Sequence, residues 1–317
     1  MLQVNIKKKL GNFLLDVDFQ MDGGVFAILG ASGCGKSMTL KCIAGIERPD
    51  EGRVVLNDRV LFDSEKKINL PPQKRKVGYM FQDYALFPNM NVVQNIQAGM
   101  GRKPDPKKVR EYITGFQLGG LEHHMPDQLS GGQKQRVAMA RMLAAEPEVL
   151  LLDEPFAALD SYLKWKMEQQ MLELLQKVQA PVLFVSHSRD EVYRLCDTVS
   201  CINQGRMEVI EPVKEFFRNP KTKTAALLSG CKNICAVEAM ESHKDGKWLW
   251  ASDWGVVIRV SKEALQARTI GIRAHFFIQE KPSEGCYSEF PVGEYRIMED
   301  PFEWNVSFRK DRSCEWL

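Results

Sequence analysis

Short runs of almost purely apolar residues alternate with helical patterns along the first two thirds of this chain. The clearest run, Val25-Phe26-Ala27-Ile28-Leu29, is too short for a typical buried helix and ends at Gly30. Similar runs occupy residues 53–56, 77–81, 149–152, 182–185 and 199–202, and helical patterns occupy residues 107–116, 132–145, 161–178 and 190–195. Strands without polar alternation are buried on both faces, so this order predicts an α/β fold with a parallel sheet covered by helices.

Composition excludes several classes of protein. The 317 residues carry 43 Lys+Arg and 41 Asp+Glu, a net charge of +2, which argues against a dedicated nucleic-acid binder. Apolar content of 44% argues against disorder. The sequence contains no run of eighteen apolar residues, so no membrane span is expected. Charged residues 7–9 are not followed by an apolar segment, so no signal peptide is expected. The eight cysteines are then expected to be reduced cytosolic thiols.

The composition changes near residue 230. Five of the six tryptophans and several short alternating runs follow that point, and residues 222–230 have the small side chains of a linker. We therefore expect one domain at 1–230 and a second, β-rich domain at 231–317. Its last residues, 303–317, still have a strand pattern, which predicts an incomplete or atypical domain.

A glycine-rich loop follows the first buried strand. Residues 30–37, Gly-Ala-Ser-Gly-Cys-Gly-Lys-Ser, fit the phosphate-binding pattern of glycine, four residues, then Gly-Lys-Ser. Loop N–H groups and a helix N-terminus provide positive potential for a polyphosphate. Lys36 would reach the β- and γ-phosphates and Ser37 would bind Mg²⁺. The alternative is a chance glycine-rich turn, which the strand before the loop makes less favourable.

Two acids end another buried strand. After residues 149–152, Asp153 is predicted to hold Mg²⁺ and Glu154 to act as the general base on the attacking water. The alternative is that two acids merely begin a turn at Pro155.

The segment Leu129-Ser130-Gly131-Gly132-Gln133, twenty residues before Asp153, resembles the signature motif of the ABC ATPases. An N-cap role would explain Ser130 alone but not the whole set of motifs. The resemblance implies a P-loop ABC ATPase domain with a RecA-like core, a helical subdomain at about 83–148, and a small β-rich (OB/TOBE-like) domain after it. It also implies a head-to-tail homodimer, in which the signature motif of each subunit serves the nucleotide of the other.

The resemblance assigns further residues by their place in the family motifs. Gln82 matches the Q-loop glutamine, which senses Mg²⁺ and the attacking water, and His187 matches the switch histidine. Residues 158–160, ending in Asp160, match the D-loop at the dimer interface, and Phe13 is expected to stack on adenine. The implied nucleotide-binding residues are Phe13, Gly30, Ala31, Ser32, Gly33, Cys34, Gly35, Lys36, Ser37, Met38, Ser130, Gly131, Gly132, Gln133 and Asp160; the implied catalytic residues are Glu154, His187 and Gln82; the implied metal ligands are Ser37, Gln82 and Asp153.

Within the family, the chain is similar to the ATPases of bacterial importers, closest to the molybdate and sulfate group. Residues 10–13, 60–64 and 68–72 carry that similarity, and residues 269–274 resemble a strand of the regulatory domains of these ATPases. This kinship implies ATP and Mg²⁺ as cofactors, molybdate, tungstate or sulfate as the solute, permease subunits that contact residues 83–90, an indirect solute-binding protein, and a place at the cytoplasmic face of the membrane. An importer for iron, a polyamine or a sugar, a non-transport ABC ATPase and an inactive scaffold are the alternatives.

Overall fold

The computed structural model describes residues 1–157, 161–175, 180–240, 248–280, 288–299 and 304–317. The chain divides into two compact units, Met1–Arg218 and Asn219–Leu317. Among the described residues, no helix combines the length and apolarity needed to cross a membrane.

A parallel sheet forms the centre of the first unit. Its strands are β10 (Thr198–Asn203), β3 (Val25–Leu29), β9 (Val182–Ser186), β8 (Val149–Asp153) and β7 (Val77–Met80), in that order. Every residue of β3, β8 and β9 is buried, as expected for strands covered on both faces. The alternating residues of β8 point into two separate cores, so the α/β prediction is confirmed in its physical detail.

An antiparallel sheet continues from this parallel part. It contains β1 (Leu2–Leu10), β2 (Phe13–Met21), β4 (Glu51–Leu56), β5 (Arg59–Asp63) and β6 (Ile68–Asn69), and joins β10 through β11 (Arg206–Met207). The short strand β12 (Glu211–Pro212) also pairs with β10. In β1 and β2 the buried and less buried residues alternate, because one face packs on helix α1 (Lys36–Ala44).

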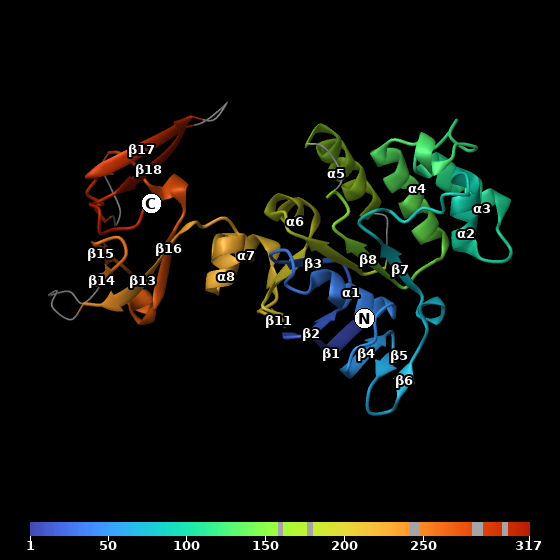
Figure 1. The fold of residues 1–317 in the computed structure, drawn as a ribbon, viewed down its shortest axis with the longest axis horizontal. Helices are drawn as coiled ribbons and strands as arrows, with labels where there is room; N and C mark the ends of the chain where they lie inside the picture. Colours follow the sequence, from blue (N-terminus) through green and yellow to red (C-terminus); the bar gives the residue numbers. More distant parts are fainter. Residues whose placement is uncertain (158–160, 176–179, 241–247, 281–287, 300–303) are drawn as a thin grey trace. The chain divides into compact units, whose positions relative to one another are not determined.

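The helices divide into groups that Figure 1 shows clearly. Helices α2 (Val92–Met100), α3 (Pro106–Gly115) and α4 (Gly131–Ala144) pack together beyond β7. Helices α5 (Ser161–Leu175) and α6 (Arg189–Leu195) lie nearer β8, β9 and β3, and α7 (Val213–Arg218) ends the first unit. Short 3₁₀ turns lie at Pro72–Lys74 and Pro126–Gln128 in the first unit, and at Lys262–Gln266 and Ala274–Phe276 in the second.

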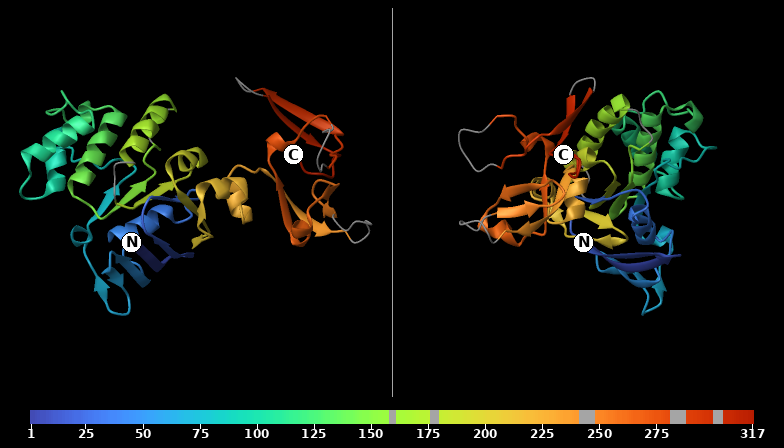
Figure 2. Two further views of the ribbon diagram at one scale, coloured as in Figure 1. Left: turned by 180° about the vertical axis from the view of Figure 1, so that it is seen from behind. Right: turned by 60° about the vertical axis from the view of Figure 1, so that its left-hand side comes forward.

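The second unit is β-rich, as expected. Helix α8 (Lys223–Leu228) precedes a four-stranded antiparallel sheet in the order β15 (Val256–Arg259), β14 (Trp248–Ala251), β13 (Asn233–Ala239), β16 (Thr269–Ile272). A separate hairpin pairs β17 (Glu294–Glu299) with β18 (Trp304–Arg309); both parts are orange to red in Figure 2. Trp254, which is 2% exposed, lies in the core of this unit, which accounts for part of the tryptophan enrichment.

The predicted linker at residues 222–230 is wrong. Thr222 caps α8 by accepting a 3.1 Å hydrogen bond from the Ala225 amide. The guanidinium of Arg273, just after β16, donates to the Ser229 carbonyl oxygen at 2.7 Å and to its hydroxyl at 3.0 Å. These bonds attach the small-residue segment to the second unit, so the division falls after Arg218 rather than at residue 230.

Candidate active site

The predicted site residues of the first unit converge where parallel strands end. The glycine-rich loop follows β3, Asp153 ends β8, Glu154 follows it, and His187 follows β9. Leu29 pairs with Ser186, and Asp153 pairs with Val185, so these loops leave the sheet at one edge. The carboxyl ends of the strands are where open α/β sheets bind ligands.

The loop adopts its shape because several of its residues lack a Cβ atom. A Cβ at Gly30 would lie 2.6 Å from the Cys34 Sγ and 2.9 Å from the Ile202 carbonyl oxygen. Gly35, with φ of 111°, precedes α1 in a left-handed conformation that other residues rarely adopt. The glycines therefore allow the tight turn that joins β3 to α1.

The Lys36 ammonium lies inside this loop. Its Nζ donates to the carbonyl oxygens of Gly30 at 2.8 Å and Ala31 at 3.0 Å, and the residue is 4% exposed. It also lies 3.7 Å from the Glu154 Oε1. The buried cation is thus held by a carboxylate and by oxygens of the loop, where a phosphate oxygen can take their place.

A chain of hydrogen bonds fixes the Asp153 carboxylate. The Ser37 hydroxyl donates to its Oδ1 at 2.8 Å, and the Tyr79 hydroxyl of β7 donates to its Oδ2 at 2.7 Å. Burial and the neighbouring Asp153 charge raise the pKa of Tyr79 strongly, so the phenol remains a donor at all physiological pH values. Ser37 and Asp153 together offer hydroxyl and carboxylate oxygens, the hard ligands that Mg²⁺ prefers alongside phosphate. Tyr79 was missed, because a tyrosine in a buried strand carries no signal of such a role.

Glu154 lies between Lys36 and His187. Its backbone has a φ of 45°, which is strained for a residue with a side chain, and its amide donates to the Val185 carbonyl oxygen at 3.0 Å. The Glu154 Oε2 lies 3.3 Å from the His187 Nδ1. The imidazole is 59% exposed and the carboxylate 19%, so a water molecule in front of the pair can lose a proton to the carboxylate.

Phe13 lies against the loop. A Cβ at Gly35 would be 3.4 Å from the Phe13 ring, and one at Gly205 would be 3.1 Å from it. The half-buried ring therefore borders the entrance to the phosphate-binding loop. Met38 is also half-buried and packs on the core of the antiparallel sheet.

The signature segment begins a different helix. Ser130 is the N-cap of α4: its hydroxyl accepts from the Gln133 amide at 3.3 Å, and the Gln133 side chain accepts from the Ser130 amide at 2.8 Å. Ser130 is exposed, and α4 packs with α2 and α3 rather than with α1 (Figure 1). Within this chain, the N-cap role accounts for the contacts of Ser130.

Gln82 and the residues after it follow β7. Since Met80 pairs with Leu152, Gln82 lies at the same edge of the sheet as Glu154, and it is exposed. Of the aromatic residues in this segment, Phe87 is 46% exposed, whereas Tyr84 is 5% exposed and packs in the helical core. The D-loop residues 158–160, including Asp160, lie outside the described residues.

An arginine of α4 holds this segment in place. Arg141 donates to the carbonyl oxygens of Tyr84 at 3.0 Å and Ala85 at 2.7 Å. Its guanidinium carbon lies 5.0 Å from the centre of the Phe87 ring, a cation–π contact. Burial lowers the pKa of Arg141. No sequence motif points to this residue.

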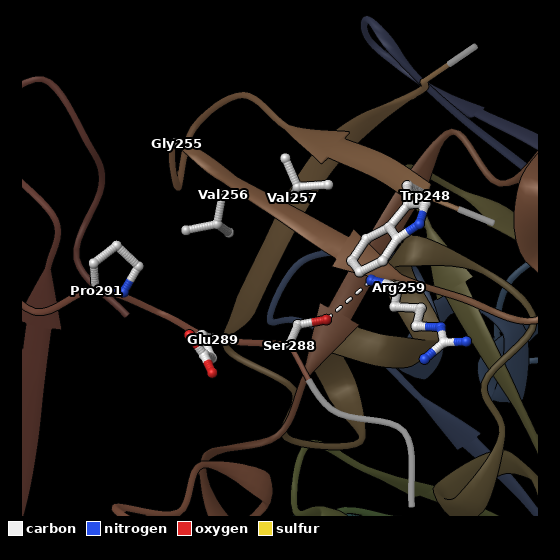
Figure 3. A pocket seen from close by; sticks show the side chains of 8 residues that line it. All are labelled: Trp248, Gly255, Val256, Val257, Arg259, Ser288, Glu289 and Pro291. Atoms are coloured by element: carbon white, nitrogen blue, oxygen red, sulfur yellow. Dashed lines mark hydrogen bonds between the residues drawn. The ribbon is translucent and has the colours of Figure 1, made fainter. Parts of the chain in front are cut away.

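The second unit contains a cavity of its own, with a volume of about 520 Å³. Figure 3 shows it between strand β15 and the segment that contains Ser288 and Pro291. The Arg259 amide donates to the Ser288 hydroxyl oxygen at 2.9 Å across one side of it. Among the described residues that line the cavity, Arg259 is cationic and Glu289 is a carboxylate.

Comparisons with known proteins agree with these motifs. Residues 14–157 match the sequence model of the family described as ABC transporter. A molybdenum import ATP-binding protein of Aliivibrio fischeri is 42% identical over 221 residues, which cover 69% of this chain and 60% of that protein. One from Paramagnetospirillum magneticum is 36% identical over 282 residues, which cover 87% of this chain and 77% of that protein. An Fe(3+) ions import ATP-binding protein of Haemophilus influenzae is 42% identical over 225 residues, 68% of this chain and 63% of that protein.

Two of these relatives are therefore matched over less than two thirds of their length. A solved structure of the ATP-binding cassette MJ0796, in a dimeric post-hydrolysis state bound to ADP and Pi, has a TM-score of 0.56 and 27% identity. That likeness covers 67% of this chain and 99% of the cassette. The fold, the loop after β3 and the extent of the Paramagnetospirillum match lead to one conclusion: the chain belongs to the ABC transporter family of ATP-binding proteins.

Proposed function

We propose that this chain is the ATP-hydrolysing subunit of an ABC importer for an oxyanion of the molybdate type. One observation carries the enzymatic part of the proposal. Lys36, Glu154 and His187 form a line of charged and polar groups beside the Ser37–Asp153 pair, at the edge where the parallel strands end. An inactive scaffold would not need a strained glutamate between a buried lysine and an exposed histidine.

The loop of residues 30–37 binds the triphosphate of ATP. Its N–H groups and the N-terminus of α1 neutralise phosphate oxygens, and Lys36 exchanges loop carbonyl oxygens for the β- and γ-phosphates. Mg²⁺ would be held by Ser37 and Asp153 and would neutralise charge on the same phosphates. Tyr79 keeps the Asp153 carboxylate oriented. Gln82, which follows β7, would be a further metal ligand, and Phe13 would stack on adenine.

Glu154 accepts the proton of the attacking water. His187 donates a hydrogen bond to the γ-phosphate and keeps the Glu154 carboxylate directed at that water through the 3.3 Å contact. Since the imidazole is more than half exposed in a single chain, the site is closed by a second subunit.

The second subunit is another copy of this chain. Ser130 and the following glycines begin α4 away from the loop that begins α1, so in a head-to-tail dimer they complete the site of the partner. The solved MJ0796 cassette is dimeric, which supports a dimer of this chain. Asp160 would lie at the same dimer interface.

Permease subunits are the proposed membrane partners, at the cytoplasmic face. Phe87 and Met90 are 46% and 36% exposed on the helical group and offer an apolar contact next to Gln82. A solute-binding protein would act indirectly, through the permease. The near-neutral charge of the chain gives no support for a nucleic-acid partner.

Kinship to molybdenum import proteins supports molybdate as the solute. The match to the Paramagnetospirillum molybdenum protein spans 282 residues and so extends into the second unit, whereas the matches to the Aliivibrio molybdenum protein and to the iron protein span 221 and 225 residues. We infer that the second unit is a regulatory domain. Its cavity has both a cation, Arg259, and a carboxylate, Glu289, among its described lining residues, which gives no support for assigning an oxyanion to that cavity.

Uptake in cells tests this function. Cells that lack this chain should lose molybdate uptake, and the wild-type gene should restore it while a Glu154→Gln gene should not. Loss of Fe(III) uptake alone would identify iron rather than molybdate as the solute. Molybdate uptake restored by both the wild-type and the Glu154→Gln gene would contradict the role of hydrolysis. Hydrolysis by the purified chain, measured with and without molybdate, tungstate and sulfate, tests the regulatory domain separately.

A further inference from the structure

A buried carboxylate lies next to the switch histidine and is not part of the proposed chemistry. Glu191, in the first turn of α6, is 4% exposed. Its Oε2 accepts a 2.6 Å hydrogen bond from the Ser186 hydroxyl, and its Oε1 pairs with the Lys164 ammonium of α5. A carboxylate is costly to bury, so it is retained only where both its oxygens have partners, as they do here.

These contacts close the turn that carries His187. Ser186 is the last residue of β9, and its hydroxyl oxygen accepts from the Ser188 amide at 2.8 Å. Ser188 caps α6, with its hydroxyl 3.5 Å from the Glu191 amide. Since a hydroxyl has one proton, the Glu191 charge determines which way the Ser186 O–H points and leaves its lone pairs for Ser188. The backbone on both sides of His187 is thereby fixed.

An acidic residue near a helix N-terminus has a simpler explanation, which is stabilisation of the helix dipole. Asp190 already provides that charge in the same turn of α6, and its side chain is 65% exposed. The dipole therefore accounts for Asp190, but it does not account for the burial of Glu191 or for its pairing with Lys164.

Lys164 connects the turn to another part of the molecule. It lies in the first turn of α5 (Ser161–Leu175), the helix that begins directly after Asp160. A displacement of the start of α5 would therefore act on Glu191, then on Ser186 and on the turn of His187.

We propose that Glu191 is a positioning residue, which holds His187 against Glu154 and links that position to α5 through Lys164. The expected effect on kcat rests on the proposed ATP hydrolysis, whereas the expected effect on the position of His187 does not. A kinetic and a structural measurement test the two effects separately.

The kinetic test compares Glu191→Gln with Asp190→Asn, a matched change at the exposed neighbour. Loss of a charged hydrogen-bond acceptor should lower kcat for ATP hydrolysis by about tenfold in Glu191→Gln, with KM and nucleotide binding nearly unchanged. Asp190→Asn should keep kcat within about twofold. In a Ser186→Ala background, Glu191→Gln should cause little further loss, because the two residues act as one unit. The proposal would be overturned if the kcat losses of Ser186→Ala and Glu191→Gln were additive. It would also be overturned if Glu191→Gln and Asp190→Asn lowered kcat equally.

The structural test observes His187 directly and needs no activity. The chain contains five histidines, and the imidazole NMR resonance that disappears in His187→Ala identifies this one. The chemical shift of this resonance should change in Glu191→Gln and Lys164→Met. It should keep its wild-type value in Asp190→Asn and in Lys164→Arg, which retains the positive charge. An unchanged resonance in Glu191→Gln would refute the positioning role even if hydrolysis were slower. A wild-type chain without hydrolysis would refute the proposed function and leave this test in force.

Discussion

The Ser37 hydroxyl donates a 2.8 Å hydrogen bond to the Asp153 carboxylate, which joins the start of α1 to the end of β8 across 116 residues of sequence. The bond places one hydroxyl and one carboxylate at the edge of the sheet where Lys36, Glu154 and His187 also lie. Four predictions test what this edge does and what holds it together.

Replacing Glu154 by Gln should abolish turnover and preserve nucleotide binding. The amide keeps the size of the side chain but cannot accept a proton, so kcat should fall at least about 100-fold. With ATP present, the variant should then accumulate as a dimer, which light scattering after size-exclusion chromatography would detect. Glu148→Gln, which changes an acid that pairs with Arg59 and Lys76, serves as the control. Substantial turnover by Glu154→Gln would remove this residue from the role of general base.

Replacing Tyr79 by Phe should weaken the response to Mg²⁺. Without its 2.7 Å hydrogen bond, the Asp153 carboxylate is less well oriented, and the Mg²⁺ concentration for half-maximal hydrolysis should rise about tenfold. Tyr112→Phe is the matched control, since its hydroxyl bonds to the Leu143 carbonyl oxygen in the helical group. A common Mg²⁺ dependence for both variants would show that Tyr79 has only a packing role.

Replacing Gly30 by Ala should damage the loop. The new methyl group would lie 2.6 Å from the Cys34 Sγ and 2.9 Å from the Ile202 carbonyl oxygen. We expect a loss of about 1–3 kcal/mol in the free energy of unfolding and weaker ATP binding. Gly115→Ala, at a helical position with open space around its Cβ, should preserve both. Normal ATP affinity in Gly30→Ala, measured by equilibrium binding, would contradict the close approach.

Stability at alkaline pH should depend on Cys42. Burial raises the pKa of this thiol from 9.0 to about 12, because the thiolate is poorly solvated in α1. The folded pKa exceeds the unfolded one, so the unfolded chain loses this proton first. The contribution of Cys42 to stability is therefore complete below pH 9 and is lost as pH rises toward 12.

Urea unfolding at pH 8, 9.5 and 10.5 measures this effect. Cys42→Ala should show a shallower loss of unfolding free energy with pH than the wild type, by up to about 1.4 kcal/mol per pH unit. Cys314→Ala, in the second unit, is the comparison. Equal slopes in wild type and Cys42→Ala would show that the thiol is not the group responsible.

The parallel sheet and the loop could be predicted from sequence because local patterns determine them. Apolar runs specify buried strands, and the order of residues 30–37 specifies the loop that follows β3. Tyr79 and Glu191 could not be predicted, because their partners are distant in sequence or depend on the packing of α5 on α6. Residues 222–230 were mistaken for a linker because small side chains are typical of linkers, while the bonds from Arg273 that order Ser229 are tertiary.

Arg141 reaches residues 84 and 85 through their backbone oxygens rather than through their side chains. Every amino acid has a carbonyl group, so a substitution at the exposed Ala85 can change what the segment recognises without removing its attachment to α4. Recognition of the proposed permease partner can therefore change during evolution while the mechanical connection of the segment to α4 is kept.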